Sequence, residues 1–211
     1  MRSPFEGLTK FQKNKLFDLL GVHIYNFDKN QEILPTIKNE NIIGIILEGS
    51  AQIVDVEYNG NEIVKEKLEK DSVFGSNISY TNSESCQIIA KHDTQVLVID
   101  YVKLINPVNL NHNYFNLFFY NLFDIMSDKL KKMNERVKIL EKKQIREKLL
   151  EFFDIEYKKY HIRNTINLNF SFKHLADYLA IDRSAMFREL KHMKEEKLIE
   201  IHNKKINLLY K

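Results

Sequence analysis

The residues with the clearest chemical potential lie near the carboxyl end of the chain. Arg183, Ser184, Phe187, Arg188 and Lys191 are separated by one, three, one and three positions, so a helix would carry them on one side. Guanidinium and ammonium groups on a helix face donate hydrogen bonds to phosphate oxygens and to guanine edges. The spacing therefore predicts a surface that binds a polyanion, with nucleic acid as the expected one.

The flanking residues predict the scaffold for this surface. Two apolar sets at helical spacing indicate two short helices, with Leu175, Ala176 and Leu179 on the first and Met186, Leu190 and Met193 on the second. Asp182 precedes the second helix, where its carboxylate can accept a bond from a free backbone N–H. We interpret 171–193 as a helix-turn-helix with 183–193 as the recognition helix, although an ordinary helical hairpin has the same pattern.

Alternating residues on both sides of this motif predict a small sheet. Residues 166–170 alternate as one strand, and LIEIH and KINLL alternate around a tight turn near Asn203–Lys204. A helix-turn-helix with such strands is a winged helix-turn-helix. Further phosphate contacts are predicted on its first helix and on its wing: Lys173, His174, His202, Lys204 and Lys205.

A long amphipathic helix is predicted upstream, after Asn106-Pro107. Apolar residues recur there at alternating three- and four-residue steps, as in a coiled-coil seam that makes the helix pair with a second copy of itself. The alternative is a helix that lies across its own domain. The predicted seam consists of Phe115, Phe118, Leu122, Ile125, Lys129, Met133, Arg136 and Leu140.

The front of the chain reads as an antiparallel barrel or sandwich. Short β-branched runs follow a helical lead-in over 3–20, and the turns Glu48-Gly49-Ser50 and Asn59-Gly60 separate two pairs of them. The predicted strands cover 22–27, 31–34, 41–47, 51–58, 62–68, 72–74, 85–90 and 95–100. The fold class is therefore α+β, and we divide the chain into a strand-rich N-terminal domain (1–106), a dimerisation helix (107–142) and a DNA-binding domain (143–211).

Charge is distributed unevenly along the chain. From residue 128 onward there are 21 Lys and Arg against 13 Asp and Glu, a balance of +8, whereas the residues before it have a balance of −5. A basic rear half favours a polyanionic partner, although lysine-rich helices can also simply be solvated. A single cysteine and the lack of a signal-peptide pattern favour a reducing cytoplasm, and no apolar run approaches the roughly 20 residues of a membrane span.

The order of barrel, long helix and winged helix-turn-helix resembles the cyclic-AMP receptor/FNR family of bacterial transcription regulators. The best-matched pieces are IILEGSAQI (45–53), the Asn-Gly turn at 59–60, VFG (73–75) and the stretch 177–199, which looks like a subgroup of anaerobes. The resemblance implies a homodimer that binds a near-palindromic operator, responds to a small effector and contacts RNA polymerase. By position, Arg183 and Arg188 match the two common recognition-helix arginines of the family.

Several positions depart from the family pattern. Ser184 stands where many members have a glutamate that accepts from cytosine, and Phe187 stands where a small residue is usual, so it either touches a thymine methyl or packs. Ala180 replaces the usual turn glycine, at a cost of about 1 kcal/mol if the backbone there is left-handed.

The effector pocket departs further. The family's Gly-Glu pair for the ribose reads Gly75-Ser76, and its Arg-Ser pair for the cyclic phosphate reads Glu84-Ser85. A carboxylate where a phosphate must sit is repulsive, so this pattern argues against cyclic-AMP binding.

Other sensing chemistries find little support in the sequence. Cys86 is the sole cysteine, which excludes the FNR iron–sulfur cluster and leaves either a redox role or an inert buried thiol. A haem sensor would need an axial ligand such as histidine, and the N-terminal half contains His23, His92 and His112. A haem-dependent gas sensor therefore remains an alternative hypothesis. The effector therefore stays unknown.

Enzymatic motifs do not occur in the sequence. It contains no GxxxxGK[ST], HExxH, CxxC or GxSxG, so we expect no enzyme. The favoured hypothesis is a sequence-specific, homodimeric DNA-binding regulator. The alternative is a ligand-binding or scaffold protein whose C-terminal domain contacts protein rather than DNA.

Overall fold

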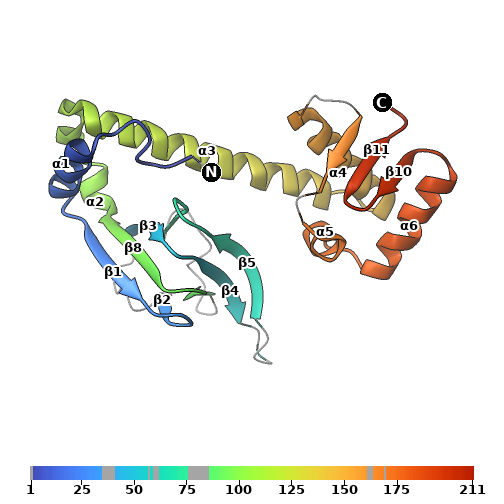
Figure 1. Cartoon of the computed structure of the whole chain (residues 1–211), viewed down its shortest axis with the longest axis horizontal. Coiled ribbons are helices and arrows are strands. Elements are labelled where there is room, and N and C mark those ends of the chain that lie inside the picture. The colour runs from blue at the N-terminus through green and yellow to red at the C-terminus, as the bar shows by residue number, and fades with distance from the viewer. Residues whose placement is uncertain are drawn as a thin grey trace. The chain divides into compact units, whose positions relative to one another are not determined.

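A computed structural model of the chain describes residues 2–34, 41–56, 58, 62–75, 86–160, 164–168 and 170–211. The chain divides into two compact units, Met1–Asp128 and Lys129–Lys211, which we describe separately (Figure 1). Within these residues, no helix combines the length and the apolar character needed to cross a membrane.

Two four-stranded antiparallel sheets form the N-terminal unit. One sheet has the order β1-β8-β3-β6, made of His23–Phe27, Thr94–Asp100, Ile42–Glu48 and Val73–Gly75. The other has the order β2-β7-β4-β5, made of Glu32–Leu34, Cys86–Ala90, Ala51–Val56 and Glu62–Leu68. A shared apolar core joins them, with Phe27, Ile46 and Val96 from the first sheet against Ile53 and Ile88 from the second. The predicted strands agree with these within one or two residues at each end.

Helices cover the outer face of the first sheet. They are α1 (Lys10–Leu20), α2 (Tyr101–Leu104), the 3-10 turn η1 (Pro107–Asn111) and the first half of α3 (Asn113–Leu140). Strands β3 and β8 alternate between the two cores, so that Ile43, Ile45 and Leu97 pack against these helices while their neighbours face the other sheet. Both faces of these strands are therefore buried.

The packing of α3 corrects the predicted dimer seam. Phe115, Phe118, Leu122 and Ile125 are buried in the core of the N-terminal unit, at 0 to 9% exposure, so they are not available to a second chain. Of the remaining predicted seam, Arg136 lies over the ring of Tyr178 in the C-terminal unit. For the front half of the helix the alternative interpretation, a helix lying across its own domain, is correct.

A different apolar stripe on α3 faces outward. Its residues recur at alternating steps of four and three and are 36 to 63% exposed: Phe119, Phe123, Met126, Leu130, Met133, Val137 and Leu140. Only Met133 and Leu140 belong to the predicted seam as well. The seven positions form a regular a/d pattern over three heptads.

Gly44 permits a close approach between two strands. A Cβ atom at this position would lie 2.3 to 2.7 Å from three ring atoms of Phe74, which is fully buried on the neighbouring strand. We therefore expect Gly44→Ala to destabilise the N-terminal unit by about 1–3 kcal/mol, because the ring must leave its packed position. Thermal unfolding followed by circular dichroism would show a lower midpoint, whereas Lys67→Ala on an exposed strand position should not change it. An unchanged midpoint for Gly44→Ala would contradict this packing.

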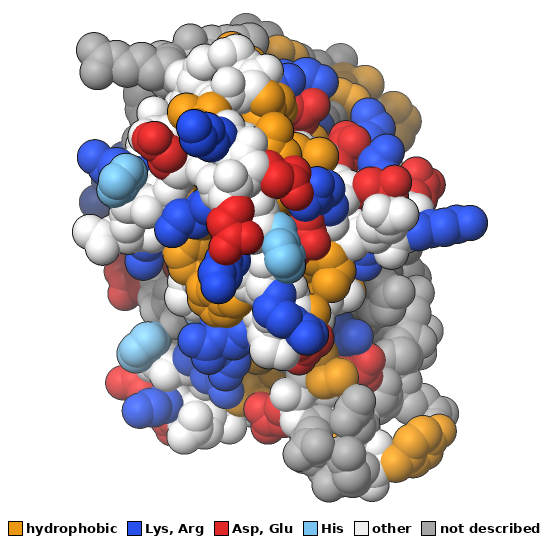
Figure 2. Space-filling view, turned by 90° about the vertical axis from the view of Figure 1, so that its right-hand side faces the viewer, with side chains coloured by type: hydrophobic (Ala, Val, Ile, Leu, Met, Phe, Trp, Pro, Cys, Tyr) orange, Lys and Arg blue, Asp and Glu red, His pale blue; other side chains and the backbone are white. Residues whose placement is uncertain are grey.

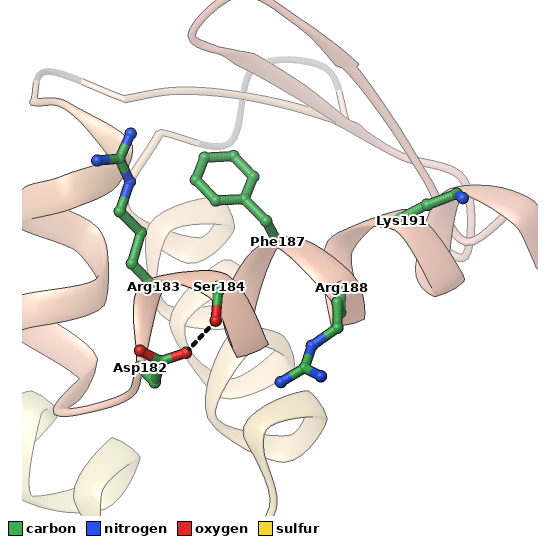
Figure 3. A pocket seen from close by; sticks show the side chains of 6 residues that line it. All are labelled: Asp182, Arg183, Ser184, Phe187, Arg188 and Lys191. Atoms are coloured by element: carbon green, nitrogen blue, oxygen red, sulfur yellow. Dashed lines mark hydrogen bonds between the residues drawn. The ribbon is translucent and has the colours of Figure 1, made fainter.

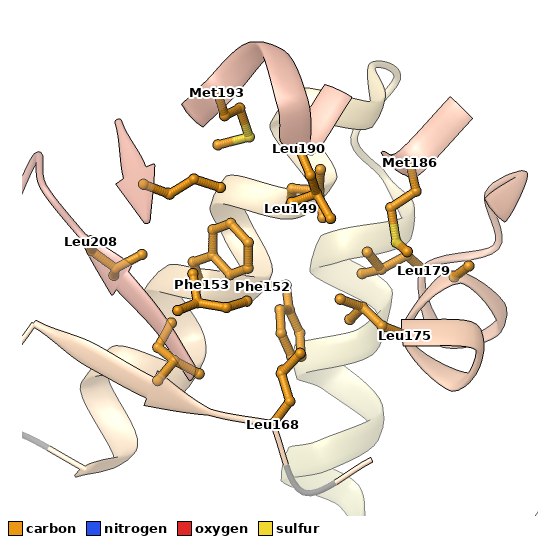
Figure 4. Packing of buried hydrophobic residues seen from close by; sticks show 14 of the residues in the cluster. Leu149, Phe152, Phe153, Leu168, Leu175, Leu179, Met186, Leu190, Met193 and Leu208 are labelled. Atoms are coloured by element: carbon orange, nitrogen blue, oxygen red, sulfur yellow. The ribbon is translucent and has the colours of Figure 1, made fainter. Parts of the chain in front are cut away.

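The C-terminal unit surrounds a core of its own. It contains the end of α3, α4 (Ile145–Tyr160), β9 (Thr165–Asn167), α5 (Phe172–Leu179), α6 (Arg183–Glu195), β10 (Ile199–His202) and β11 (Lys205–Leu208). The strands pair in the order β10-β11-β9, all antiparallel. Figure 4 shows Phe152 and Phe153 of α4 at the centre of this core, with Leu175 of α5, Leu190 of α6 and Leu208 of β11 around them. The predicted winged helix-turn-helix architecture is confirmed.

Candidate nucleic-acid interface

Helices α5 and α6 form the predicted helix-turn-helix, and side-chain caps mark where each helix begins. The Ser171 hydroxyl accepts from the backbone N–H of His174, and Asp182 accepts from that of Ala185 at 2.8 Å. Ala180 ends α5 in the left-handed conformation, with φ at +49°. The predicted strain at this alanine is therefore present, and the turn directs the chain into α6 without a glycine.

The buried and exposed sides of α6 are those that the sequence predicted. Met186, Leu190 and Met193 are at most 2% exposed and face the core. The opposite side borders a hollow of about 620 Å³ lined by six residues, shown in Figure 3: Asp182, Arg183, Ser184, Phe187, Arg188 and Lys191. The structure therefore brings five of the predicted contact residues to one surface, which we call the α6 surface.

Hydrogen bonding limits what Ser184 can do on this surface. Its hydroxyl donates to Oδ1 of Asp182 at 2.6 Å (Figure 3), and together with the Ala185 N–H this bond lowers the pKa of Asp182. Because the proton is used inside the protein, the serine oxygen presents only lone pairs outward. In a major groove it would accept from the amine of cytosine or adenine.

Arg146 of α4 forms hydrogen bonds to two carboxylates that hold α6 in place. The Arg146 guanidinium donates to Glu189 and, through two nitrogens at 2.7 and 2.8 Å, to Glu196. These bonds raise the pKa of Arg146 and lower the pKa of Glu196. The carboxylates of Glu189, in the middle of α6, and Glu196, at its C-cap, are thereby paired with a cation, and a forked bond of this kind fixes the orientation of the helix.

An aromatic contact between α5 and α6 was not indicated by the sequence. The rings of Phe172 and Phe187 lie 5.6 Å apart between centroids, and the Arg183 guanidinium carbon lies 5.7 Å from the Phe187 ring. The i,i+4 spacing of Arg183 and Phe187 could have indicated the second contact, whereas the first depends on the crossing of two helices.

The other predicted contact residues lie outside the lining of the hollow. Lys173 and His174 are exposed in the first turn of α5, and His202, Lys204 and Lys205 are exposed around the turn that joins β10 to β11. His202 faces Glu200 at 3.9 Å. Asn203 adopts a left-handed conformation, with φ at +56°, which makes this wing turn tight, as predicted.

Some cations of the C-terminal unit are paired with carboxylates and others are not. Away from the α6 surface several are neutralised, as in the pairs of Lys159 with Glu135 and Glu156 and of Lys142 with Glu151. Among the residues that the structure describes, no carboxylate within ion-pair distance faces Arg183 or Arg188, and Lys191 has only Glu195 at 3.8 Å. Figure 2 shows Lys and Arg side chains across the end of the chain that carries α6, interspersed with acidic ones. Arg183 and Arg188 are thus two cations of the α6 surface for which the described residues provide no ion pair, although the charge of Arg188 helps to lower the pKa of Asp182 on the same surface.

In the N-terminal unit only part of the predicted effector pocket falls within the described residues. Gly75 ends β6 with φ at +151°, and a Cβ there would lie 2.2 Å from the carbonyl oxygen of Ile42, so the strand pairing itself requires a glycine. Ser76, Glu84 and Ser85 lie outside the described residues, as does the Asn59-Gly60 turn.

The residues considered for haem or redox sensing have individual surroundings that the structure describes. His23 and His92 are exposed, with His92 hydrogen-bonded to Ser50 at 2.8 Å, and the ring of His112 stacks on Tyr114. Burial and the neighbouring Asp55 raise the pKa of the Cys86 thiol, which favours the inert form over a reactive thiolate.

Comparison with solved structures shows what the fold is. A CooA variant from Carboxydothermus hydrogenoformans is 18% identical with a TM-score of 0.60, covering 96% of this chain and 87% of that one. A CprK variant complexed with OCPA is 14% identical with a TM-score of 0.63, covering 92% and 88%. A cyclic nucleotide-binding domain containing protein from Listeria monocytogenes EGD-e is 17% identical with a TM-score of 0.56, covering 93% and 97%.

At these identities the likeness concerns the fold alone. The chain has the fold of these structures, a fold like that of the cyclic-AMP receptor, in agreement with the resemblance in the sequence. No family model and no curated protein matches its sequence.

Proposed function

We propose that the chain is a homodimeric, sequence-specific DNA-binding transcription regulator of the cytoplasm, and that its N-terminal unit responds to a small effector. The observation that carries this proposal is the α6 surface. It combines a capped helix, a buried apolar face that fixes the helix on the unit, and two arginines with no ion-pair partner among the described residues. This is the arrangement with which a helix enters a major groove.

Each exposed group on α6 has a defined role in this proposal. Arg183 and Arg188 donate forked bonds to guanine O6 and N7, and Ser184 accepts from an exocyclic amine. Lysine and histidine side chains around the helix bind phosphates and set its register without reading sequence. These are Lys191, Lys173 and His174 beside the two helices, and His202, Lys204 and Lys205 on the wing.

The outward stripe of α3 supports the dimer. Seven apolar side chains at a/d spacing, 36 to 63% exposed, would face water in a single chain. A two-fold pairing of these stripes buries them and provides two recognition helices for a near-palindromic operator. In this proposal residues 1–106 form the sensor domain, 107–142 the dimerisation helix and 143–211 the DNA-binding domain.

The effector is assigned only by class. The CprK variant with this fold was solved in complex with OCPA, and another structural match with a TM-score of 0.51 is described as a c-di-GMP responsive regulator. A small molecule bound in the N-terminal unit would switch the dimer by favouring one arrangement of the two DNA-binding domains. RNA polymerase is a further partner in this proposal, as the family resemblance implies.

Selection from a random DNA pool tests the proposed function. The full-length chain is expected to enrich a roughly two-fold symmetric site whose half-sites are about one helical turn apart. Affinity should fall steeply with salt, because four lysines in each protomer imply about eight phosphate contacts and a log–log slope of about −7. Failure to enrich a site, together with affinity independent of salt, would favour a C-terminal domain that contacts protein.

A further inference from the structure

Phe187 occupies an unusual place on the α6 surface. Its large apolar side chain is 42% exposed, because the core of the C-terminal unit lies on the opposite side of the helix with Met186 and Leu190. The ring contacts Phe172 at a centroid distance of 5.6 Å and a tilt of 48°, which supports it from one side. The rest of the ring lines the hollow that Figure 3 shows.

Arg183 completes the arrangement. Its guanidinium carbon lies 5.7 Å from the centroid of the Phe187 ring, and Figure 3 shows both side chains rising from the same side of α6 while Arg188 points the other way. A guanidinium over an aromatic face is attracted by the ring quadrupole. The ring therefore restricts where the Arg183 fork can point.

The chemistry of the major groove matches this pair. Phe187 can offer only an apolar contact, and among base edges the thymine C5-methyl is the apolar group that the major groove presents. Guanine presents O6 and N7 to an arginine fork. The 5.7 Å separation of the two groups corresponds to one or two base-pair steps of about 3.4 Å each.

We propose that Phe187 is a specificity-determining residue that packs against the C5-methyl group of a thymine and holds Arg183 on a guanine one or two base pairs away. The inference rests on the proposed function, because it names which bases the α6 surface reads. Each half-site of the operator would then contain one thymine whose methyl group contributes to affinity, close to a guanine. Phe172 is the positioning residue that keeps the ring outward.

Deoxyuridine substitution tests this contact directly, because deoxyuridine differs from thymidine only in lacking the C5-methyl group. In the operator selected from the random pool, each thymine is replaced in turn, and binding of the full-length chain is measured by fluorescence anisotropy at constant salt. At one thymine per half-site we expect affinity to fall about fourfold, and about fifteenfold when both half-sites are changed.

A cycle with Phe187→Ala assigns the effect to this ring. The variant should bind the thymine operator more weakly than the wild type and should be indifferent to deoxyuridine at the sensitive position. Lys191→Ala, on the same face of α6, should weaken binding and keep the wild-type response to deoxyuridine. Because Phe187 is partly exposed, circular dichroism of Phe187→Ala should match the wild type.

The outcomes separate the two proposals. A selected operator in which deoxyuridine is tolerated at every position would overturn the role of Phe187 and leave DNA binding in place. A methyl effect that persists in Phe187→Ala would also overturn it. If no operator is enriched, the proposed function itself fails.

Discussion

Leu130→Glu is expected to convert the dimer into monomers and to abolish tight operator binding. Leu130 lies in the middle of the outward stripe of α3 and is 59% exposed, so glutamate there does not disturb the core of either unit. In the proposed dimer the same change removes two buried leucines, worth about 1.5–3 kcal/mol each, and places two like charges between the paired stripes. Self-association should weaken at least about a hundredfold.

Sedimentation velocity at micromolar concentration measures the change in mass. Lys131→Glu provides the matched control, because it introduces the same residue one position along the helix, outside the stripe. This control should sediment as a dimer and bind the operator nearly as the wild type does. A Leu130→Glu variant that remains dimeric would show that the stripe of α3 is covered by something other than a second copy of the chain.

Two apolar stripes on one helix explain why sequence periodicity alone did not distinguish the buried stripe from the exposed one. Phe115, Phe118 and Leu122 follow the same three- and four-residue steps as Phe119 and Phe123. Which stripe is internal depends on the sheet and on the N-terminal segment, where Phe5 stacks on Phe118 with centroids 5.5 Å apart. Because these two residues are more than a hundred positions apart, no local sequence pattern indicates their contact.

The strands could be predicted because their signals are local. β3 and β4 are dominated by β-branched residues, and Gly49 turns between them with φ at +80°. By contrast, the short α2 and the 3-10 turn η1 were not predicted, since each is only about one turn long and begins at a cap, Asp100 or Asn106. Elements this short have too few residues for a period to emerge.

The candidate site likewise has parts that the sequence predicted and parts that it did not. The α6 surface and the cap at Asp182 followed from residue type and spacing, and the structure places them as expected. The bonds from Arg146 to Glu189 and Glu196 join residues 43 and 50 positions apart, and nothing in the sequence near Arg146 indicates them. The orientation of α6 therefore depends partly on contacts that only the folded chain reveals.

Arg183→Ala should weaken binding to the selected operator by about 1–3 kcal/mol for each forked contact, or roughly five- to 150-fold. It should also relax the preference at one base pair per half-site, because the fork to guanine O6 and N7 is lost. Competition between the operator and all single substitutions of it, measured by mobility shift, would show the preference vanish at that base pair. Arg183→Lys keeps the charge without the fork, so it should relax the preference nearly as much.

Lys204→Ala distinguishes sequence reading from charge in the same assay. Lys204 is exposed on the wing turn, and its loss should weaken binding to all sequences alike and make the salt slope about one unit shallower for each protomer. If Arg183→Ala behaved as Lys204→Ala does, Arg183 would be a phosphate contact and the recognition helix would read sequence through Arg188 and Ser184. A relaxed preference confined to Arg183→Ala and Arg183→Lys instead requires a base contact, because a phosphate carries no information about the base attached to it.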